Sequence, residues 1–238
     1  MEIQLNCTPF VNEILSKKLR LRTALELMPK DYELYYDLFC DHGLLGYALK
    51  QSFNKKIVFN DCQEGITSRL RENFNLAEGE IELGKAQDLV FKENTGIFML
   101  GVGGHLLNEC FLSWQKLKRE NLYGGHTFVI GAHYYQLELK TVLRALGAEL
   151  LDQRFIFERE EGYEILLIKF LEKYQGIGKN ILDFDELYWS QVVRDEPLAM
   201  RYLEKRAKSI SKVRNPNAQQ LQFGTSLRHF MEELNSKS

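Results

Sequence analysis

Hydrophobic and polar positions follow two alternating patterns over roughly the first two thirds of the chain. Short apolar runs with the length of buried strands cover residues 33–40, 56–62, 80–86, 96–102 and 127–134. Segments with apolar residues at helical spacing lie between them, at residues 44–53, 64–75, 105–121 and 136–147. Strands that alternate with helices in this way pair in parallel through crossover helices. The pattern therefore predicts an α/β fold with a doubly wound sheet and helices on both faces.

The pattern changes at the end of this sheet. Residues 150–158 and 163–170 are both strand-like, and only a short charged turn through Glu161 and Gly162 separates them. That connection is too short for a crossover helix, so the two strands must pair antiparallel as a hairpin. A Rossmann-like parallel sheet that ends in an antiparallel hairpin is typical of class I S-adenosylmethionine-dependent methyltransferases. Dinucleotide dehydrogenases instead have a fully parallel sheet and a G-x-G-x-x-G turn, which this chain lacks.

Further helices are expected before and after the sheet region along the chain. Apolar positions at helical spacing recur at residues 11–28, 197–213 and 218–234. Pro29 ends the first helix because it lacks an N–H group, and the composition of residues 214–217 indicates a turn between the other two. We therefore expect a methyltransferase domain at residues 1–174 and a C-terminal domain at residues 175–238, formed by a coiled-coil-like pair of antiparallel helices without strands.

The formal net charge of -2 does not by itself predict a nucleic-acid-binding protein. The distribution of charge is uneven, however, because residues 196–238 contain eight Lys or Arg residues against four Glu, about +4. A second basic group lies near the N-terminus, at Lys17, Lys18, Arg20 and Arg22. Together these groups could neutralise several RNA phosphates, although a solvated helix face is the usual explanation of such a charge run.

Composition also excludes several classes of protein. The four cysteines have no pair spacing and no Cys–His spacing for a zinc site, so we predict free buried thiols and no metal at Cys7, Cys40, Cys62 and Cys110. The N-terminal MEIQLNCTPF lacks the features of a signal peptide, and no apolar run approaches the ~18 residues of a membrane helix. We therefore expect a cytoplasmic protein without a membrane span, and the sequence predicts no oligomeric state.

Candidate chemistry gathers at the predicted carboxyl ends of the strands, where open parallel sheets bind ligands. The first strand runs into Asp37 and then Gly43, where a missing side chain would let a ligand approach backbone N–H groups. The second strand ends at Asp61, which is suited to accept hydrogen bonds from ribose hydroxyls. Three glycines in residues 101–104 indicate either a ligand close to the backbone or a plain turn. Taken singly, a helix cap or a turn explains each feature; together they suit adenosine.

The order of these motifs resembles that of one family. LSKKLRLRTALELMPK, DLFCDHGLLGYAL, FNDCQEG, LGVGGHLL and YEILLIKF occur in the order and at nearly the spacing found in the TrmK family of bacterial tRNA (adenine(22)-N(1))-methyltransferases. That family typically reads LSKRL, D-I-G-S-D-H-A-Y-L-P, G-E-x-x-x-G-P and A-G-M-G-G-x-L-I, followed by a C-terminal helical pair. The resemblance covers about residues 15–210, and its most specific parts are the Asp-His segment and G-x-G-G.

The resemblance implies S-adenosyl-L-methionine as cofactor and tRNA as partner. It assigns cofactor binding to Asp37, Asp41, His42, Gly43, Asp61, Cys62, Lys85 and Gly101. The methyl donor and the base would meet at the catalytic positions Gly103, Gly104 and His133. Together with the charge distribution, it predicts RNA contacts at Lys17, Lys18, Arg20, Arg201, Lys205 and Arg206. The aromatic residues that could stack on the base are Tyr134 and Tyr135.

Four positions depart from the family pattern. Phe39 replaces the first glycine of the cofactor loop, Lys85 and Thr95 each replace an Asp, and Gly131-Ala132-His133 stands in place of Q-P-N. We therefore keep two hypotheses. The first is methyl transfer to adenine N1 of tRNA, which requires an unpaired or flipped base. The second is a catalytically impaired relative that binds RNA or a protein partner with the same scaffold.

Overall fold

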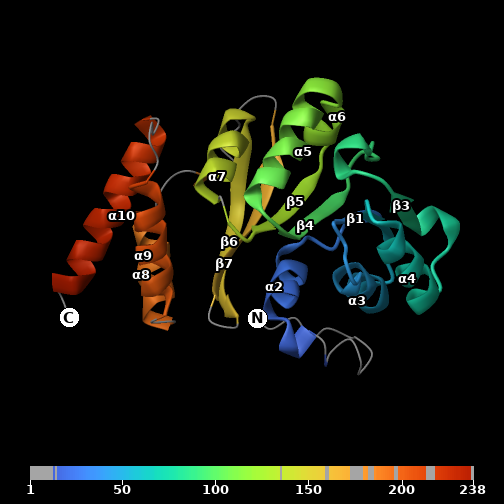
Figure 1. Ribbon diagram of the computed structural model, residues 1–238, viewed down its shortest axis with the longest axis horizontal. Coiled ribbons are helices and arrows are strands. Elements are labelled where there is room, and N and C mark those ends of the chain that lie inside the picture. Colours follow the sequence, from blue (N-terminus) through green and yellow to red (C-terminus); the bar gives the residue numbers. More distant parts are fainter. Residues whose placement is uncertain are drawn as a thin grey trace.

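The computed structural model describes residues 13, 15–134, 136–158, 161–171, 179–181, 185–195, 198–212 and 218–236. Within these ranges, eight strands form one mixed sheet with helices packed on it (Figure 1). The sheet and its two layers of helices determine where every candidate site residue lies.

Five strands of the sheet are parallel, as the alternating pattern predicts. They are β1 (Leu34–Leu38), β2 (Lys56–Asp61), β3 (Ile81–Leu83), β4 (Gly96–Val102) and β5 (Thr127–Ala132). The antiparallel strands are β6 (Ala148–Glu158), β7 (Glu161–Phe170) and the two-residue β8 (Lys179–Asn180). The spatial order is β3-β2-β1-β4-β5-β7-β6-β8. The predicted doubly wound sheet with an antiparallel hairpin is therefore confirmed.

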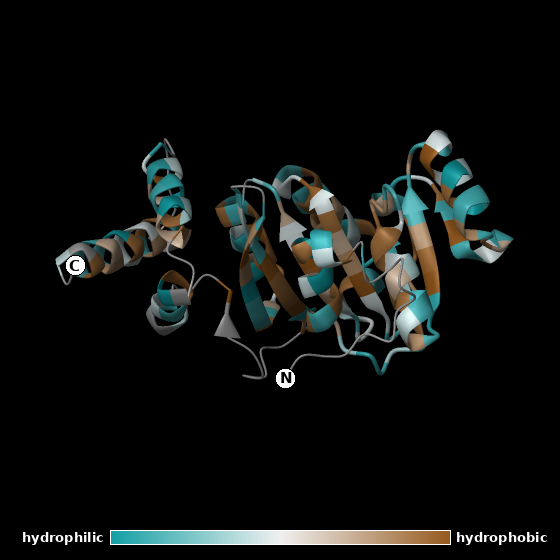
Figure 2. Ribbon diagram, turned by 90° about the horizontal axis from the view of Figure 1, so that it is seen from below, coloured by the Kyte–Doolittle hydropathy of each residue, from teal (hydrophilic) through white to brown (hydrophobic). Residues whose placement is uncertain are grey.

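Helices cover both faces of the sheet because neighbouring strand residues point to opposite sides. In β4, Ile97 and Met99 join one buried cluster, whereas Phe98 and Leu100 join the other. The first cluster includes α5 (Gly104–Leu117) and α7 (Gln136–Ala145), and the second includes α2 (Leu19–Leu27), α3 (Leu44–Phe53) and α4 (Glu64–Phe74). Figure 2 shows hydrophobic residues concentrated on the strands and mixed colouring on the outer helices. Short helical turns complete the connections at η1 (Glu78–Glu80), η2 (Ala86–Asp88) and α6 (Glu120–Tyr123).

Three C-terminal helices stand at one end of the molecule, beside the antiparallel strands (Figure 1). They are α8 (Glu186–Asp195), α9 (Ala199–Ile210) and α10 (Ala218–Ser236). Trp189, Tyr202, Phe223 and Leu227 bury their side chains in the same cluster as α5 and α7. The C-terminal helices therefore continue the layer on that face of the sheet.

A buried polar group joins α9 to the sheet; we call it the docking cluster, and it consists of Gln136, Lys140, Glu164, Tyr202 and Arg206. Nζ of Lys140 lies 2.5 Å from Oε2 of Glu164, and the Tyr202 hydroxyl donates to Oε1 of Glu164 at 2.6 Å. Nη1 of Arg206 donates to Oε1 of Gln136 at 2.5 Å and lies 3.7 Å from Oε1 of Glu164. Burial raises the pKa of Glu164, but Lys140 and Arg206 outweigh it and hold the pKa at about 2. Glu164 is therefore the anion that compensates two buried cations.

The structure differs from the sequence-based expectation in three details. The N-terminal helix predicted over 11–28 is interrupted, because Lys18 has φ -122° and ψ 69°, outside the helical region. Helix α8 is a third C-terminal helix, where a pair was expected. Strand β8 lies beyond residue 174, where no strand was expected, because the free edge of β6 supplies its hydrogen-bonding partner. The predicted turn at 214–217 lies outside the described residues.

None of the described helices is both long enough and apolar enough to span a membrane.

Candidate functional site

The carboxyl ends of β1, β2, β4 and β5 point to one edge of the sheet because these strands are parallel. A cavity of about 100 Å³ opens at this edge, and we call it the edge cavity. It is lined by Lys18, Arg20, Leu21, Asp37, Phe39, Cys40, Asp41, His42, Leu44, Leu45, Leu100 and Gly101. The structure thus brings together four of the predicted cofactor-binding residues and two of the predicted RNA-binding residues.

Asp37 is the buried acid of the edge cavity, with 5% of its surface exposed. Its Oδ2 accepts a hydrogen bond of 2.9 Å from the backbone N–H of Gly46 in α3. Burial raises the pKa of Asp37 to about 7, and the Gly46 hydrogen bond only partly opposes this. A carboxyl group that titrates near neutral pH at a sheet edge is typical of a functional site rather than of a core.

The raised pKa of Asp37 predicts a measurable stability effect. Because the pKa is about 7 when folded and 3.8 ordinarily, the contribution of Asp37 to stability is fully present below about pH 3.8 and is lost as the pH rises through about 7. Asn at this position can still accept from Gly46 but cannot ionise. We therefore expect Asp37→Asn to raise the free energy of unfolding at pH 8 by roughly 1–3 kcal/mol and to change it little at pH 4. Urea unfolding at both pH values checks this, and an equal effect at both would contradict it.

The loop after β1 has an unusual backbone. Phe39, Asp41 and Gly43 have φ values of 57°, 47° and 63°, all in the left-handed region. That conformation costs a side-chain-bearing residue about 1–2 kcal/mol. Phe39 therefore keeps the backbone geometry that favours glycine, although it is not glycine.

The missing side chain of Gly43 makes room for a neighbouring helix. A Cβ atom at this position would lie 2.6 Å from Cδ2 of Leu70 and 3.1 Å from Cε2 of Phe74, both in α4. The backbone N–H of Gly43 already donates to the carbonyl of Cys40 at 2.7 Å. The structure therefore gives this glycine a packing reason that the sequence did not suggest, and contact of a ligand with this turn stays a prediction.

The ends of β2 and β3 continue the edge beyond the edge cavity. Asp61 is buried, and its Oδ1 accepts from the backbone N–H of Gln63 at 3.0 Å. Cys62 and Lys85 are exposed at the same edge. Asn60 donates to the carbonyls of Glu82 and Gly84, but its Oδ1 is buried without a hydrogen-bond partner among the described residues. A buried acceptor without a partner is costly, which is a property of sites that a ligand completes.

The glycines at the end of β4 and the start of α5 have two different surroundings. Gly101 has φ 80°, and a Cβ atom there would meet nothing within 4 Å, so its open side faces free space. A Cβ atom on Gly103 would lie 2.4 Å from Cε2 of Tyr134, and the backbone N–H of Gly104 donates to the carbonyl of Tyr134 at 2.9 Å. The close approach inferred from this glycine run is therefore real, but at Gly103 and Gly104 the approaching group is Tyr134 of the same chain.

His133 follows β5 and lies beside the edge cavity. Nη1 of Arg20 is 3.1 Å from its Nε2, and the guanidinium of Arg20 lies 4.9 Å from the ring centroid of Tyr163. Burial and the charge of Arg20 lower the pKa of His133, although a hydrogen bond with the backbone of Gly101 opposes them. His133 is therefore a neutral imidazole at neutral pH, able to accept a hydrogen bond from Arg20.

Arg20 is fixed from several sides. Its backbone N–H donates to Oε2 of Glu158 at 3.0 Å, and its Nε is buried without a hydrogen-bond partner among the described residues. Glu158 and Tyr163 did not emerge from the sequence, because both lie on the hairpin, more than a hundred residues from Arg20 in the chain. No local pattern signals such a contact.

The predicted RNA-binding residues have different surroundings. Lys17 is exposed and paired with Glu13 at 2.6 Å, and Arg201 is exposed on α9. Lys205 is 67% exposed and lies 3.2 Å from Oε1 of Glu161. Arg206 is instead 12% exposed within the docking cluster, so we exclude it from the proposed RNA surface. Tyr135 lies outside the described residues.

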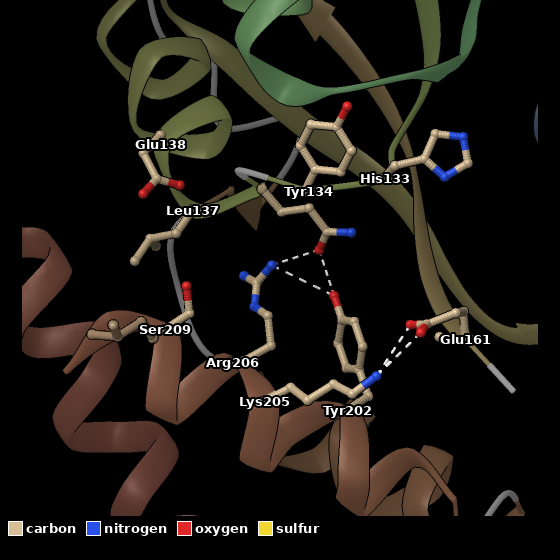
Figure 3. Close-up of a pocket in the computed structure, with 12 residues that line it drawn as sticks. His133, Tyr134, Leu137, Glu138, Glu161, Tyr202, Lys205, Arg206 and Ser209 are labelled. Atoms are coloured by element: carbon tan, nitrogen blue, oxygen red, sulfur yellow. Dashed lines mark hydrogen bonds and ion pairs between the residues drawn. The ribbon is translucent and has the colours of Figure 1, made fainter. Parts of the chain in front are cut away.

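A larger cavity of about 550 Å³ lies between α9 and the segment that joins β5 to α7, and we call it the junction cavity. Figure 3 shows Tyr202 and Arg206 rising from α9 towards this segment. The cavity is lined by His133, Tyr134, Gln136, Leu137, Glu138, Glu161, Gly162, Tyr202, Lys205, Arg206, Ser209 and Ile210. Of these residues, His133 also contacts Arg20, which lines the edge cavity.

Other predicted positions lie away from the site. Thr95 precedes β4 at the opposite edge of the sheet and contacts Nδ1 of His126 at 2.8 Å, so this departure from the family pattern does not touch the edge cavity. Cys40 and Cys110 are buried as predicted, whereas Cys62 is exposed, and Cys7 lies outside the described residues. Over the part of the chain that the structure describes, no three or more His, Cys, Asp or Glu side chains are grouped to hold a metal ion.

Comparison with protein families decides how this geometry is interpreted. Residues 17–166 match the family described as methyltransferase domain. The chain belongs to this methyltransferase family. The matched region begins at Lys17 and ends within β7, so the edge cavity and three residues of the docking cluster, Gln136, Lys140 and Glu164, lie inside it. A search of the curated proteins finds no match to the sequence.

Solved structures with the same fold extend over most of this methyltransferase. M. capricolum TrmK in complex with S-adenosyl-homocysteine has 17% sequence identity and a TM-score of 0.60, covering 91% of this chain and 96% of that chain. The Streptococcus pneumoniae protein Sp1610 in complex with S-adenosyl-L-methionine has 15% identity and a TM-score of 0.63, covering 90% and 98%. The B. subtilis m1A22 tRNA methyltransferase TrmK has 16% identity and a TM-score of 0.52, covering 91% and 96%. These likenesses establish the class I S-adenosylmethionine-dependent methyltransferase fold.

Proposed function

We propose that this chain is an S-adenosylmethionine-dependent methyltransferase that acts on tRNA and transfers a methyl group to adenine N1. The observation that carries the proposal is that Arg20 and Asp37 line one cavity at the carboxyl edge of a methyltransferase-domain sheet, and that the buried Nε of Arg20 lacks a partner among the described residues. The tRNA substrate is supported by two TrmK structures, whose similarity covers 91% of this chain and so extends into the C-terminal helices. The proposal places the protein in the cytoplasm with its tRNA substrate.

The residues at the edge fit the chemistry of S-adenosylmethionine. Asp37 and Asp41 would hold the ammonium group of its amino-acid end, and Arg20 and Lys18 would hold the carboxylate. Asp61 would accept hydrogen bonds from the ribose hydroxyls. A cavity of about 100 Å³ is small beside ordinary ligand pockets of about 300–1,000 Å³, so it can enclose only part of the cofactor. Gly43, His42, Cys62 and Lys85 border that edge.

When bound, the cofactor would supply a methyl group on a sulfonium, and transfer to the lone pair of N1 would form a C–N bond, break the C–S bond and leave its electron pair on sulfur as S-adenosylhomocysteine. N1 needs no base to remove a proton first, so the main task of the protein is positioning. Gly101 leaves open space beside the edge cavity, and the neutral His133 can donate or accept one hydrogen bond at the base. Positive charge moves onto the ring during transfer, and carboxylates near the base stabilise it.

The test is a methyl-transfer assay with labelled S-adenosylmethionine and unmodified tRNA, followed by nucleoside analysis of the digested product. We expect label in 1-methyladenosine. Label in another nucleoside would retain the methyltransferase assignment and replace the adenine N1 assignment. Cofactor binding without any transfer to tRNA would instead favour the second candidate function, a catalytically impaired protein that binds RNA or a protein partner.

Phe39 is the observation that favours the second candidate, because its ring lines the small edge cavity and its φ of 57° departs from what Phe prefers. We expect the wild-type protein to bind S-adenosylhomocysteine and Phe39→Gly to bind it about 10-fold more tightly, because the ring no longer narrows the cavity. Calorimetric titration measures both affinities. Phe39→Ala is the matched control: it also removes the ring but keeps a side chain at positive φ, so it should gain affinity as well if the ring narrows the cavity. Binding by both variants but not by the wild-type protein would mean that the Phe39 ring has closed the site.

A further inference from the structure

The junction cavity adjoins the edge cavity through His133, which lines the junction cavity and contacts Arg20 in the lining of the edge cavity. Nε2 of His133 lies 3.1 Å from Nη1 of Arg20. The Tyr134 ring fills the space beside Gly103, where a Cβ atom would approach it to 2.4 Å. Both His133 and Tyr134 line the junction cavity (Figure 3). A group in the junction cavity would therefore lie next to the place where a methyl group would be presented.

We infer that the junction cavity receives the acceptor nucleoside of the RNA, and that α9 forms its far wall. The inference rests on the proposed function and deepens it, because it assigns the C-terminal helices a direct part in the active site. The cavity volume of about 550 Å³ is within the usual range for small-ligand pockets, about 300–1,000 Å³. Enzymes that act on a base drawn out of a stack bind it in a pocket with an aromatic or apolar wall.

The charges in the junction cavity favour a neutral base over a phosphate. Lys205 is paired with Glu161 at 3.2 Å, and Arg206 lies 3.7 Å from Glu164. Glu138 adds a further carboxylate to the lining. Because the cations already face carboxylates, the cavity does not present the unpaired positive charge that a phosphate requires. The same carboxylates would stabilise a base that becomes positively charged on methylation.

The lining also supplies a stacking surface and hydrogen-bonding groups. Tyr134 is 62% exposed, so one face of its ring is accessible to a planar ligand. Stacking of a base on an aromatic side chain is worth about 1–3 kcal/mol. Ser209 lies on α9 opposite this segment, with its hydroxyl directed towards Leu137 in Figure 3. A bulky side chain at Ser209 would therefore occupy the space that the inference assigns to the base.

The deciding experiment compares Ser209→Trp with Ser211→Trp. Ser209 lines the junction cavity, whereas Ser211, two residues later and exposed at the end of the same helix, does not. We expect Ser209→Trp to lower kcat/KM for tRNA methylation at least about 10-fold, while affinity for S-adenosylhomocysteine and the melting temperature stay at wild-type values. We expect Ser211→Trp to keep wild-type kcat/KM. An unchanged kcat/KM in Ser209→Trp would overturn the inference.

Two further variants test the stacking surface. Tyr134→Ala should lower kcat/KM roughly 10-fold or more, and Tyr134→Phe should retain most of it, because the ring rather than the hydroxyl contacts the base. Equal losses in both variants, or no loss in either, would contradict a stacking role. The wild-type protein tests the proposed function separately, because its failure to methylate any RNA would overturn that function. If the wild-type protein methylates tRNA and the variants keep its kcat/KM, only the assignment of the junction cavity is overturned.

Discussion

Replacing Glu164 with glutamine will lower the free energy of unfolding by about 3–5 kcal/mol, because it leaves two buried cations without their anion. Nζ of Lys140 lies 2.5 Å from Oε2 of Glu164, where the side chains are 6% and 4% exposed. Arg206 of α9 lies 3.7 Å from the same carboxylate. Glutamine fills the same volume and can still accept from Tyr202, so the loss arises mainly from charge. The measurement is urea unfolding of the full chain at neutral pH.

The matched control is Glu161→Gln on the same strand. Glu161 also pairs with a cation of α9, because Lys205 lies 3.2 Å away, but the two side chains are 60% and 67% exposed. Exposed ion pairs contribute about 0–1 kcal/mol, so this variant should unfold almost like the wild-type protein. Similar losses in the two variants would mean that burial does not govern the effect, and the account of the docking cluster would fail.

The destabilisation caused by Glu164→Gln should depend on pH, and the pKa of Glu164 gives the direction. The pKa of Glu164 is about 2 in the folded protein, below its ordinary value of 4.5, because Lys140 and Arg206 outweigh the effect of burial. Its contribution to stability is therefore fully present above about pH 4.5 and is lost as the pH falls through about 2. The difference between wild-type and Glu164→Gln stability should shrink below about pH 4.5 and vanish near pH 2. A difference that stays constant over this range would contradict the assignment.

Replacing Asp61 with alanine will weaken binding of S-adenosylhomocysteine at least about 100-fold. A carboxylate that accepts hydrogen bonds from two ribose hydroxyls contributes about 1.5–3 kcal/mol for each, and 1.4 kcal/mol corresponds to a factor of ten. Asp61 is buried at the carboxyl end of β2, with Oδ1 already accepting from Gln63 at 3.0 Å. That hydrogen bond already orients the carboxylate, so binding of the ribose does not have to restrict the rotation of the Asp61 side chain. Calorimetric titration measures the change.

Asp152→Ala is the control for this prediction. Asp152 lies on β6, away from the edge cavity, and its Oδ1 likewise accepts from a nearby backbone N–H, that of Gln153, at 2.7 Å. The variant therefore removes a comparable local hydrogen bond without touching the proposed cofactor site, and it should bind like the wild-type protein. If Asp61→Ala also binds normally, the ribose assignment is wrong even if the fold and the cofactor are right.

Much of the fold was predictable because each element carries its own periodicity. The apolar runs of β1, β2, β4 and β5 are short and bounded by helical segments, and the charged segment before residue 163 is too short for a crossover helix. Glu161 and Gly162, which were predicted as the turn, already belong to β7, because they pair with Glu158 and Phe157 of β6. Parallel strands and the final hairpin follow from these lengths alone. Strand β8 could not be predicted in this way, because its two residues pair with the edge of β6 and have no pattern of their own.

The sequence predicted which residues lie at the carboxyl edge of the sheet, but not what surrounds each of them. Position after a strand predicts that Asp37, Asp61 and Gly101 lie at one edge, because parallel strands end together. The surroundings of single residues did not follow. Gly43 looked like a place for a ligand, yet its missing side chain makes room for α4, and Gly103 makes room for Tyr134.

By itself, the sequence determined the class of fold, the edge of the sheet where chemistry gathers and the chain's two basic regions, because these depend on local periodicity and on strand direction. The tertiary structure alone decided that Arg20 turns inward to His133 and that Arg206 is buried with Glu164 rather than exposed to solvent. It also decided that α9 encloses a cavity beside Tyr134. Such contacts join residues far apart in the chain, so no local pattern predicts them. Burial, not residue type, determines whether an arginine forms an ion pair within the protein or stays available to solvent and ligands.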